Sequence, residues 1–356
     1  MTPAQVLERR ATSAAGLYGG RNPVARPPGS EEADVTVRIA VLDDYQGVAL
    51  RHGRWTELAG AQVTLFREHL PDPVELARRL QGFDVLVAMR ERTPITRDVL
   101  AELPALRLLV TTGMHNSAVD MAAAAELGIT VCGTQSDASG PAELTWGLIL
   151  GLARHLVAED ASVRRGGWQQ TVGLGLRGRT LGVIGAGRIG GQVARVGRAF
   201  DMRVLAWSQN LTAERAAEAG AELVAKEELL RSSDVVSLHL RLSERSRGII
   251  GAADLALMRP SAVLVNTSRG GLVDEQALLL ALRDGTIAGA GLDTFWDEPL
   301  PNGHPITAAP NTLLSPHLGY VTDSTYDVFY GQAAEDVAAF LAGAPVRVLA
   351  APTAPR

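Results

Sequence analysis

Two series of short apolar runs, alternating with helix-length segments, constrain the fold of this chain more than any other feature. The first series spans residues 37–133 and the second spans 180–316. Runs such as VRIAVLD (37–43) and FDVLVAM (83–89) are typical of buried strands. Alternation of strands and helices predicts parallel sheets with helices on both faces. We therefore expect an α/β protein with two such sheets.

The other expected elements continue this pattern along the chain. Further strands are expected at 106–113, 129–133, 180–185, 202–208, 222–224, 234–240, 262–268, 289–295 and 312–316. Helices are expected at 73–80, 95–106, 116–128, 141–156 and 274–285. The last of these opens with acidic residues and ends at Gly285, as the helix dipole and C-terminal glycine preference favour.

Length and composition exclude several functional classes. A chain of 356 residues has room for two domains with separate cores. The net charge of −5 provides no basic surface for nucleic acid or an anionic membrane. No segment reaches the roughly 18 apolar residues of a membrane span. The single cysteine, Cys132, excludes internal disulfides and Cys-rich metal sites. We expect a cytoplasmic protein with no metal, nucleic-acid or membrane partner.

The N-terminal region differs in composition from the rest of the chain. Residues 21–34 are rich in proline, glycine and charge, so residues 1–35 are predicted to be a flexible extension. Residues 1–26 contain no apolar core of a secretory signal. An organellar presequence over the same residues is the alternative.

A glycine-rich turn links a predicted strand to a predicted helix in the second series. Gly185, Gly187 and Gly190 follow the strand TLGVI and precede RIGGQVARVGRAF, which begins with Arg188 and Ile189. The first glycine allows a sharp turn, the second admits a pyrophosphate close to the backbone, and the third lets the helix pack on the strand. The helix N-terminus then faces the phosphate charge. This arrangement predicts a dinucleotide site.

The next position of interest is the end of the second strand, where a carboxylate commonly holds the adenosine ribose. Here the residue is Ser208, eighteen residues after Gly190, and no arginine follows it directly to hold a 2′-phosphate. Arg215 is the nearest. We expect NAD as the cofactor, with NADP as the alternative.

Several motifs in a fixed order give the chain a specific resemblance. They are GVIGAGRIG, LLRSSDVVSLHLRLS, LMRPSAVLVNTSRGGLVDEQALLLAL, GAGLDTFWDEPLP and LLSPHLGY. Between about residues 142 and 320 the chain resembles the D-isomer-specific 2-hydroxyacid dehydrogenases, a family that includes glyoxylate/hydroxypyruvate reductases, D-lactate dehydrogenases and phosphoglycerate dehydrogenases. The resemblance implies an oxidoreductase that transfers a hydride between a nicotinamide cofactor and a 2-oxo acid/D-2-hydroxy acid pair.

The resemblance implies a catalytic trio. Arg269 matches the substrate arginine, whose forked, permanent charge suits adjacent carboxylate and carbonyl oxygens. His317 matches the acid/base, because imidazole titrates near neutrality. Glu298 matches the carboxylate that pairs with this histidine and fixes its ring. Formate-dehydrogenase-like members carry glutamine there, so Glu298 argues against that activity.

The resemblance assigns further positions to cofactor and substrate. The cofactor positions in addition to the turn are Ser208, His239, Ser243, Thr267, Asp293 and Gly319. The backbone N–H groups of Gly113, Met114 and His115 are expected to bind the substrate carboxylate. Arg90 is expected near the substrate mouth, where it pairs either with a second anionic group or with a neighbouring loop carboxylate.

Three departures from the family pattern leave cofactor preference and substrate identity open. Arg241 replaces proline in HLRLS, Tyr320 replaces glycine in HLGY, and Ser208 replaces the ribose carboxylate. A dinucleotide-sensing protein, similar to corepressors that keep the catalytic trio, is the alternative to an enzyme.

The resemblance also implies a discontinuous architecture of two Rossmann-like, doubly wound domains. A substrate-binding domain is expected at 36–136 and 320–356, with the NAD(P)-binding Rossmann domain, 137–319, inserted into it. The helix at 141–156 and the turn-rich segment after it are expected to form a homodimer interface.

Overall fold

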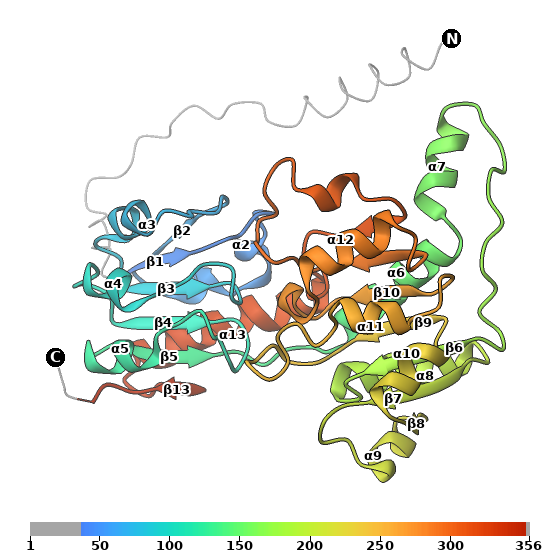
Figure 1. Ribbon diagram of the computed structural model, residues 1–356. Helices are drawn as coiled ribbons and strands as arrows, with labels where there is room; N and C mark the ends of the chain where they lie inside the picture. Colours follow the sequence, from blue (N-terminus) through green and yellow to red (C-terminus); the bar gives the residue numbers. More distant parts are fainter. Residues whose placement is uncertain (1–36, 354–356) are drawn as a thin grey trace, which may run out of the picture. The chain divides into compact units, whose positions relative to one another are not determined.

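The structure, a computed structural model, describes residues 37–353, which contain two sheets (Figure 1). The first sheet has the strand order β13-β5-β4-β3-β1-β2. Its strands are β1 (Val37–Val41), β2 (Ala61–Leu65), β3 (Val85–Ala88), β4 (Leu108–Thr111), β5 (Thr130–Gly133) and β13 (Val348–Ala350). All neighbours pair in parallel except β13, which is antiparallel to β5. The predicted N-terminal extension lies outside the described residues.

Helices cover both faces of the first sheet. They are α2 (Ala49–His52), α3 (Pro73–Leu80), α4 (Arg97–Ala101), α5 (Met121–Glu126) and α13 (Asp323–Leu341). Alternate residues of a strand point to opposite faces. Accordingly, Val85 and Val87 belong to the core shared with α13, whereas Leu86 belongs to the core shared with α3, α4 and α5.

The second sheet has the strand order β12-β11-β10-β9-β6-β7-β8 and is parallel throughout. Its strands are β6 (Thr180–Ile184), β7 (Arg203–Trp207), β8 (Glu222–Leu223), β9 (Val235–Leu238), β10 (Val263–Asn266), β11 (Gly289–Leu292) and β12 (Thr312–Leu314). Its helices are α6 (Ser139–Ala153), α7 (Leu156–Arg164), α8 (Arg188–Ala199), α9 (Ala213–Glu218), α10 (Lys226–Ser232), α11 (Ala252–Leu257) and α12 (Glu275–Arg283). Two apolar cores lie on its two faces.

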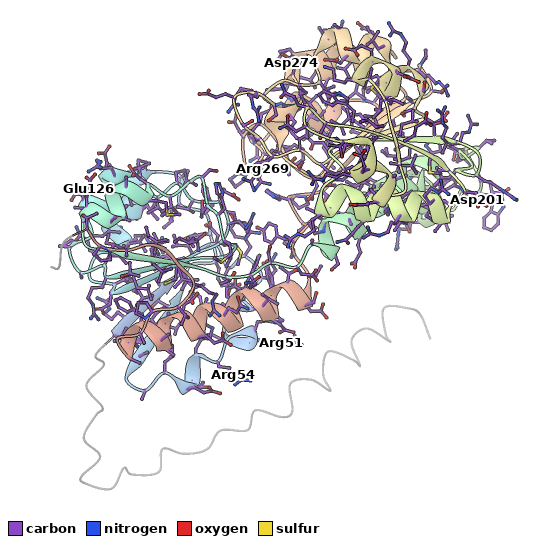
Figure 2. The ribbon with its side chains drawn as sticks, turned by 90° about the horizontal axis from the view of Figure 1, so that it is seen from below. Arg51, Arg54, Glu126, Asp201, Arg269 and Asp274 are labelled. Atoms are coloured by element: carbon purple, nitrogen blue, oxygen red, sulfur yellow. The ribbon has the colours of Figure 1, made fainter. Side chains whose placement is uncertain are left out.

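Local sequence explains where several helices begin. Asp72 accepts hydrogen bonds from the N–H groups of Val74 and Glu75, with Pro73 as the first residue of α3. Asp274, labelled in Figure 2, caps α12 in the same way through the N–H of Ala277. A proline at the first helical position and an aspartate before it are favourable because the first N–H groups of a helix have no partner within it.

The fold class predicted from the sequence is confirmed: the chain forms two doubly wound parallel sheets, and it returns to the first sheet through β13 after completing the second. The order of the second sheet around β6 is that of a classical dinucleotide-binding fold, and the first has the 2-1-3-4-5 order of the flavodoxin-like arrangement. The expected strands and helices are present. Most are shorter than expected, whereas α3 has the expected bounds and α6 begins and ends earlier than the expected 141–156. The sequence pattern did not indicate β2, β13, α2, α7 or α13. The residue boundaries proposed for the two domains stay a prediction.

Strand order also determines where a ligand can bind. In open α/β sheets ligands bind beyond the carboxyl ends of the strands, where the strand order reverses. The reversal lies between β1 and β3 in the first sheet and between β6 and β9 in the second. A ligand is therefore expected at the segments that follow β1, β3, β6 and β9.

Candidate functional site

The turn between β6 and α8 has the backbone that the glycine motif predicts. Gly185 has φ of +100°, and a Cβ there would lie 2.8 Å from the backbone of His239. A Cβ at Gly190 would collide with the carbonyl oxygen of Gly185, so the helix approaches the strand as closely as glycine allows. At Gly187, the residue before α8, an added Cβ would meet no atom of residues 37–353 within 4 Å. The turn thus leaves space at the helix N-terminus, where backbone N–H groups attract phosphate.

A pocket of about 720 Å³ opens beside this turn. It collects residues that are far apart in the sequence from the ends of β3, β4, β9 and β10. The sequence-predicted site residues that line it are Arg90, Met114, His115, Arg188, Ile189, His239, Ser243 and Arg269. Its size and its position at the reversal of strand order fit a dinucleotide.

His239 is half-buried in the wall of this pocket. Its Nε2 lies 2.8 Å from the hydroxyl of Ser237. Burial lowers the pKa of His239 to about 4, because a charged ring would lose its hydration there. The ring is therefore neutral at pH 7 and adds no positive charge beside a bound cofactor.

The other predicted cofactor residues lie at strand ends of the second sheet. Ser208 directly follows β7, and its carbonyl accepts the N–H of Leu211. Thr267 follows β10, and its hydroxyl lies 2.7 Å from that of Thr145 in α6. The pocket lining includes neither Ser208 nor Thr267.

The segment after β4 bears on the predicted contacts to the substrate carboxylate. The N–H of Gly113 donates to the hydroxyl of Thr134 at 2.9 Å, so this donor is already used within the protein. Within residues 37–353, the N–H groups of Met114 and His115 make no hydrogen bond. Of the three predicted donors, Met114 and His115 are the ones available to a ligand.

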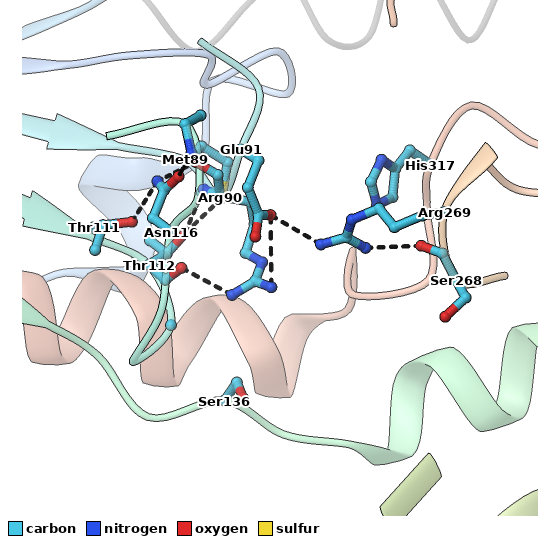
Figure 3. Close-up of polar contacts among 12 residues, drawn as sticks. Met89, Arg90, Glu91, Thr111, Thr112, Asn116, Ser136, Ser268, Arg269 and His317 are labelled. Atoms are coloured by element: carbon cyan, nitrogen blue, oxygen red, sulfur yellow. Dashed lines mark hydrogen bonds and ion pairs between the residues drawn. The ribbon is translucent and has the colours of Figure 1, made fainter. Parts of the chain in front are cut away.

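Arg269 and Arg90 meet at one carboxylate, that of Glu91 (Figure 3). The Arg269 Nη2 atom lies 3.0 Å from Oε2 of Glu91, and Nη2 of Arg90 lies 3.7 Å from the same oxygen. Arg269 also donates to the carbonyl of Ser268, and Arg90 donates to the carbonyl of Thr112. Of the two partners expected for Arg90, the structure supplies the loop carboxylate.

His317 and Glu298 form a close pair. His317 Nδ1 lies 2.5 Å from Oε2 of Glu298, and the other carboxylate oxygen of Glu298 accepts the N–H of Phe295. Burial raises the pKa of Glu298, but the hydrogen bond and charge of His317, the Phe295 N–H and the charge of Arg269 together hold it below its usual value. The carboxylate is therefore ionised at neutral pH and can orient the ring.

Asp293 fixes the loop that carries His317. Its side chain is fully buried, and its two oxygens accept the N–H groups of Leu318 and Gly319 at 2.7 and 2.8 Å. Burial raises the pKa of Asp293, although these hydrogen bonds oppose that effect. Both oxygens are thus engaged in holding the two residues after His317. The predicted contact of Asp293 with a nicotinamide stays a prediction.

A smaller pocket of about 350 Å³ lies against the His317–Glu298 pair. Tyr45, Glu91 and Arg92 are also in its wall. The guanidinium of Arg92 lies 4.4 Å from the ring centre of Tyr45 and 5.3 Å from that of Tyr320, the residue that replaces the family's glycine. The ring of Tyr320 packs edge-on against His317, with 5.5 Å between centres.

Sequence reasoning missed Glu91 and Arg92 as site residues. Both follow β3 at the carboxyl edge of the first sheet, beside Arg90, which it did select. The signal was the dense charge of RERT directly after a buried strand, because parallel strands direct such segments to the ligand edge.

Comparison with known proteins identifies the family. Residues 146–319 match the family model described as D-isomer specific 2-hydroxyacid dehydrogenase, NAD binding domain. The chain is 39% identical over 293 residues to a glyoxylate reductase of Aeropyrum pernix, covering 79% of this chain and 87% of that one. It is 38% identical over 290 residues to a glycerate dehydrogenase of Methylorubrum extorquens, covering 78% and 89%. The chain belongs to the D-isomer specific 2-hydroxyacid dehydrogenase family.

Solved structures of the family agree with the fold. A phosphoglycerate oxidoreductase from Vibrio cholerae superimposes with a TM-score of 0.82 at 40% identity, covering 86% of this chain and all of that one. The D-lactate dehydrogenase of Escherichia coli superimposes with a TM-score of 0.77 at 26% identity, covering 88% and 100%. The chain is thus an oxidoreductase with an NAD-binding domain, and the corepressor alternative finds no support among these relatives.

Within residues 37–353, no helix combines the length and apolar character needed to cross a membrane. The single cysteine, Cys132, is buried in β5 and forms no disulfide.

Proposed function

We propose that this family member interconverts a 2-oxo acid and a D-2-hydroxy acid with NAD as cofactor, using His317 and Glu298 as the acid/base pair. The contact of 2.5 Å between His317 Nδ1 and Glu298 Oε2 carries the proposal. The carboxylate fixes the ring with Nδ1 facing it, which leaves Nε2 as the atom that can exchange a proton with substrate.

When bound, the nicotinamide supplies or accepts the hydride. The turn at Gly185, Gly187 and Gly190 holds the pyrophosphate of the dinucleotide at the N-terminus of α8, with Arg188 and Ile189 as its first residues. The open space at Gly187 and the pocket beside the turn support this assignment. His239, Ser243, Thr267, Asp293 and Gly319 complete the proposed cofactor site.

Three groups of the chain bind and polarise the substrate. The N–H groups of Met114 and His115 hold its carboxylate, because Gly113 is engaged with Thr134. Arg269 binds the carboxylate and carbonyl oxygens with its forked guanidinium and stabilises the negative charge that develops on the carbonyl oxygen. Arg90 stays paired with Glu91 at the mouth of the site.

The proton is transferred between His317 and the carbonyl oxygen of the substrate. In reduction, His317 donates a proton from Nε2 to the developing alkoxide, and in oxidation it takes the proton back. Glu298 stabilises the positive ring before the transfer and holds its orientation throughout. Tyr320 packs against the same ring and limits its movement.

NAD rather than NADP is part of the proposal, and so are a homodimer and a cytoplasmic location. The family model describes an NAD-binding domain, and Ser208 leaves room for ribose hydroxyls without supplying a cation for a 2′-phosphate.

The homodimer is supported by large apolar side chains exposed on and just after α7. They are Leu156, Val157, Val163, Trp168 and Val172. The cytoplasm is supported by the single, unoxidised cysteine.

The test is absorbance of the reduced nicotinamide on mixing the protein with NADH or NADPH and a panel of 2-oxo acids. The panel contains glyoxylate, hydroxypyruvate, pyruvate, a branched 2-oxo acid and a phosphorylated one. We expect oxidation of NADH with at least one acid and a slower reaction with NADPH. Binding of the dinucleotide without reduction of any acid would contradict the proposal and favour a sensor.

A further inference from the structure

Among the described residues, Glu91 is the only one that lines both pockets. It follows β3 and Arg90, and it faces the cofactor-side pocket with Arg269 as well as the smaller pocket with His317 and Glu298. In the proposed reaction the carbonyl oxygen of the 2-oxo acid contacts both Arg269 and His317. The carboxylate of Glu91 therefore lies beside the substrate, where Figure 3 shows it next to Arg269.

The environment of Glu91 keeps its side chain charged. The side chain is 19% exposed, and burial raises its pKa, but the charges of Arg90 and Arg269 outweigh this effect and hold the pKa below its usual value. Neither arginine has a second carboxylate within 4.0 Å in the described residues. Glu91 therefore competes with the substrate carboxylate for the guanidinium of Arg269.

Because the smaller pocket lies against His317 and Glu298, it is the space that would receive the substituent on the third carbon of a 2-oxo acid bound at this pair. Glu91 forms part of the wall of that pocket. A second anionic group placed there would lie close to a buried negative charge, and like charges in a poorly hydrated site repel strongly. A neutral or hydrogen-bond-donating substituent meets no such penalty, because a carboxylate accepts hydrogen bonds.

We propose that Glu91 is a specificity-determining residue, which competes with the substrate for Arg269 and selects 2-oxo acids whose third carbon carries a neutral or hydrogen-bond-donating group over those with a second anion. This inference rests on the proposed function. Arg92 lines the same pocket, but its guanidinium is held over the rings of Tyr45 and Tyr320, and its single positive charge faces the two carboxylates of Glu91 and Glu298 in the pocket wall.

The experiment compares hydroxypyruvate with its phosphate ester by kcat/KM, two substrates that differ by an anionic phosphoryl group on the third carbon, and reads the effect of charge from the change in their ratio between the wild type and the variants. The wild type should prefer hydroxypyruvate by about tenfold or more. Glu91→Gln should shift the ratio toward the phosphate ester by about tenfold, mainly through KM. Glu91→Asp keeps the charge and should keep the preference. Glu126→Gln is the matched control, because Glu126 of α5 forms an exposed ion pair with Arg97 (Figure 2). This change should leave the ratio unchanged.

A second readout separates this inference from the proposed function. Malonate and propionate have the same chain length and differ by one carboxylate, and their binding is measurable as thermal stabilisation of the NADH complex without turnover. Glu91→Gln should tighten malonate about tenfold and change propionate less. Failure of every acid in the panel to react would contradict the proposed function, and malonate and propionate would still decide the role of Glu91. A wild type that favours the phosphate ester, or a variant with unchanged ratios, overturns the inference.

Discussion

The imidazole of His317 and the carboxylate of Glu298 are held against each other from two loops that follow neighbouring strands of the second sheet. Glu298 follows β11 and His317 follows β12, and Nδ1 of the ring lies 2.5 Å from Oε2 of the carboxylate. His317 has φ of +54°, a conformation that side-chain-bearing residues rarely adopt. Asp293 accepts hydrogen bonds from the N–H groups of Leu318 and Gly319, the two residues after His317. The imidazole of His317 is therefore held both by Glu298 and by the fixed backbone of its own loop.

Replacing His317 should remove the acid/base and little else. We expect His317→Ala to lower kcat by a factor of about 10²–10⁴, because a positioned general acid contributes an effect of that size. Dinucleotide binding should stay near that of the wild type, since the residue does not line the cofactor-side pocket. Steady-state kinetics together with fluorescence titration of NADH check this. A variant with normal turnover would remove His317 from the mechanism.

Glu298 should control the pH range of the reaction. Its carboxylate is ionised at neutral pH and favours the positive ring that reduction requires. We expect Glu298→Gln to move the alkaline limb of the reduction profile to lower pH, because the variant lacks this favourable charge. The profile of kcat/KM from pH 5 to 9 measures the shift. Glu275→Gln, at the His304 pair elsewhere in the domain, is the matched control, and an unchanged profile in Glu298→Gln would contradict the role.

Much of this site could be predicted from the sequence because its chemistry is carried by residues at strand ends. Gly185, Arg269 and His317 each follow a strand that apolar runs reveal. What could not be predicted is which side chains meet. In the sequence, Glu91 is one of several charged residues in RERT. Its pair with Arg269 forms only because the loops of the two sheets approach each other in the fold. The sequence gives no sign that the N–H of Gly113 has a partner, because its acceptor, the hydroxyl of Thr134, lies twenty-one residues later in the chain.

Strands with weak patterns were missed for a related reason. β2 has no fully buried residue, and β13 has only three residues at the end of the first sheet. In β2 the polar residues Gln62 and Thr64 interrupt the apolar run that identifies central parallel strands such as β3, and the three apolar residues of β13 are too few to identify a strand.

Cofactor preference should respond to a charge at Ser208. A carboxylate at this position, directly after β7, can accept hydrogen bonds from both adenosine ribose hydroxyls and repel a 2′-phosphate. We expect Ser208→Asp to raise the ratio of kcat/KM for NADH over NADPH by about tenfold or more. Ser208→Asn, which is similar in size but neutral, is the control. The same ratio in all three proteins would mean that the ribose is held elsewhere.

The apolar segment around α7 should be an interface between two copies of the chain. Val157 is 62% exposed and Trp168 is 71% exposed, which is unfavourable for side chains of this size in water. We expect a dimeric mass by light scattering at micromolar concentration. Val157→Asp combined with Trp168→Ser should give a monomer, whereas Val74→Ser, at an exposed valine of α3, should not. A monomeric wild type would contradict the homodimer.

Asp336 should make stability fall as the pH rises toward neutrality. Its side chain is fully buried in α13, and although Arg347 lies 3.0 Å away, burial raises the pKa to about 7. Between its ordinary pKa of 3.8 and 7, the folded chain keeps a proton that the unfolded chain releases. The free energy of unfolding therefore decreases across this range, by at most about 4 kcal/mol in total.

Asp336→Asn tests this effect because the amide has the size of the carboxyl group and does not titrate. Urea unfolding at pH 5, 6, 7 and 8 should show a smaller loss of stability with pH in the variant than in the wild type. Asp201→Asn is the control, since Asp201 lies in an exposed turn where asparagine tolerates its φ of +56° (Figure 2). Equal pH dependence in Asp336→Asn and wild type would mean that the pair with Arg347 stays ionised in the folded chain.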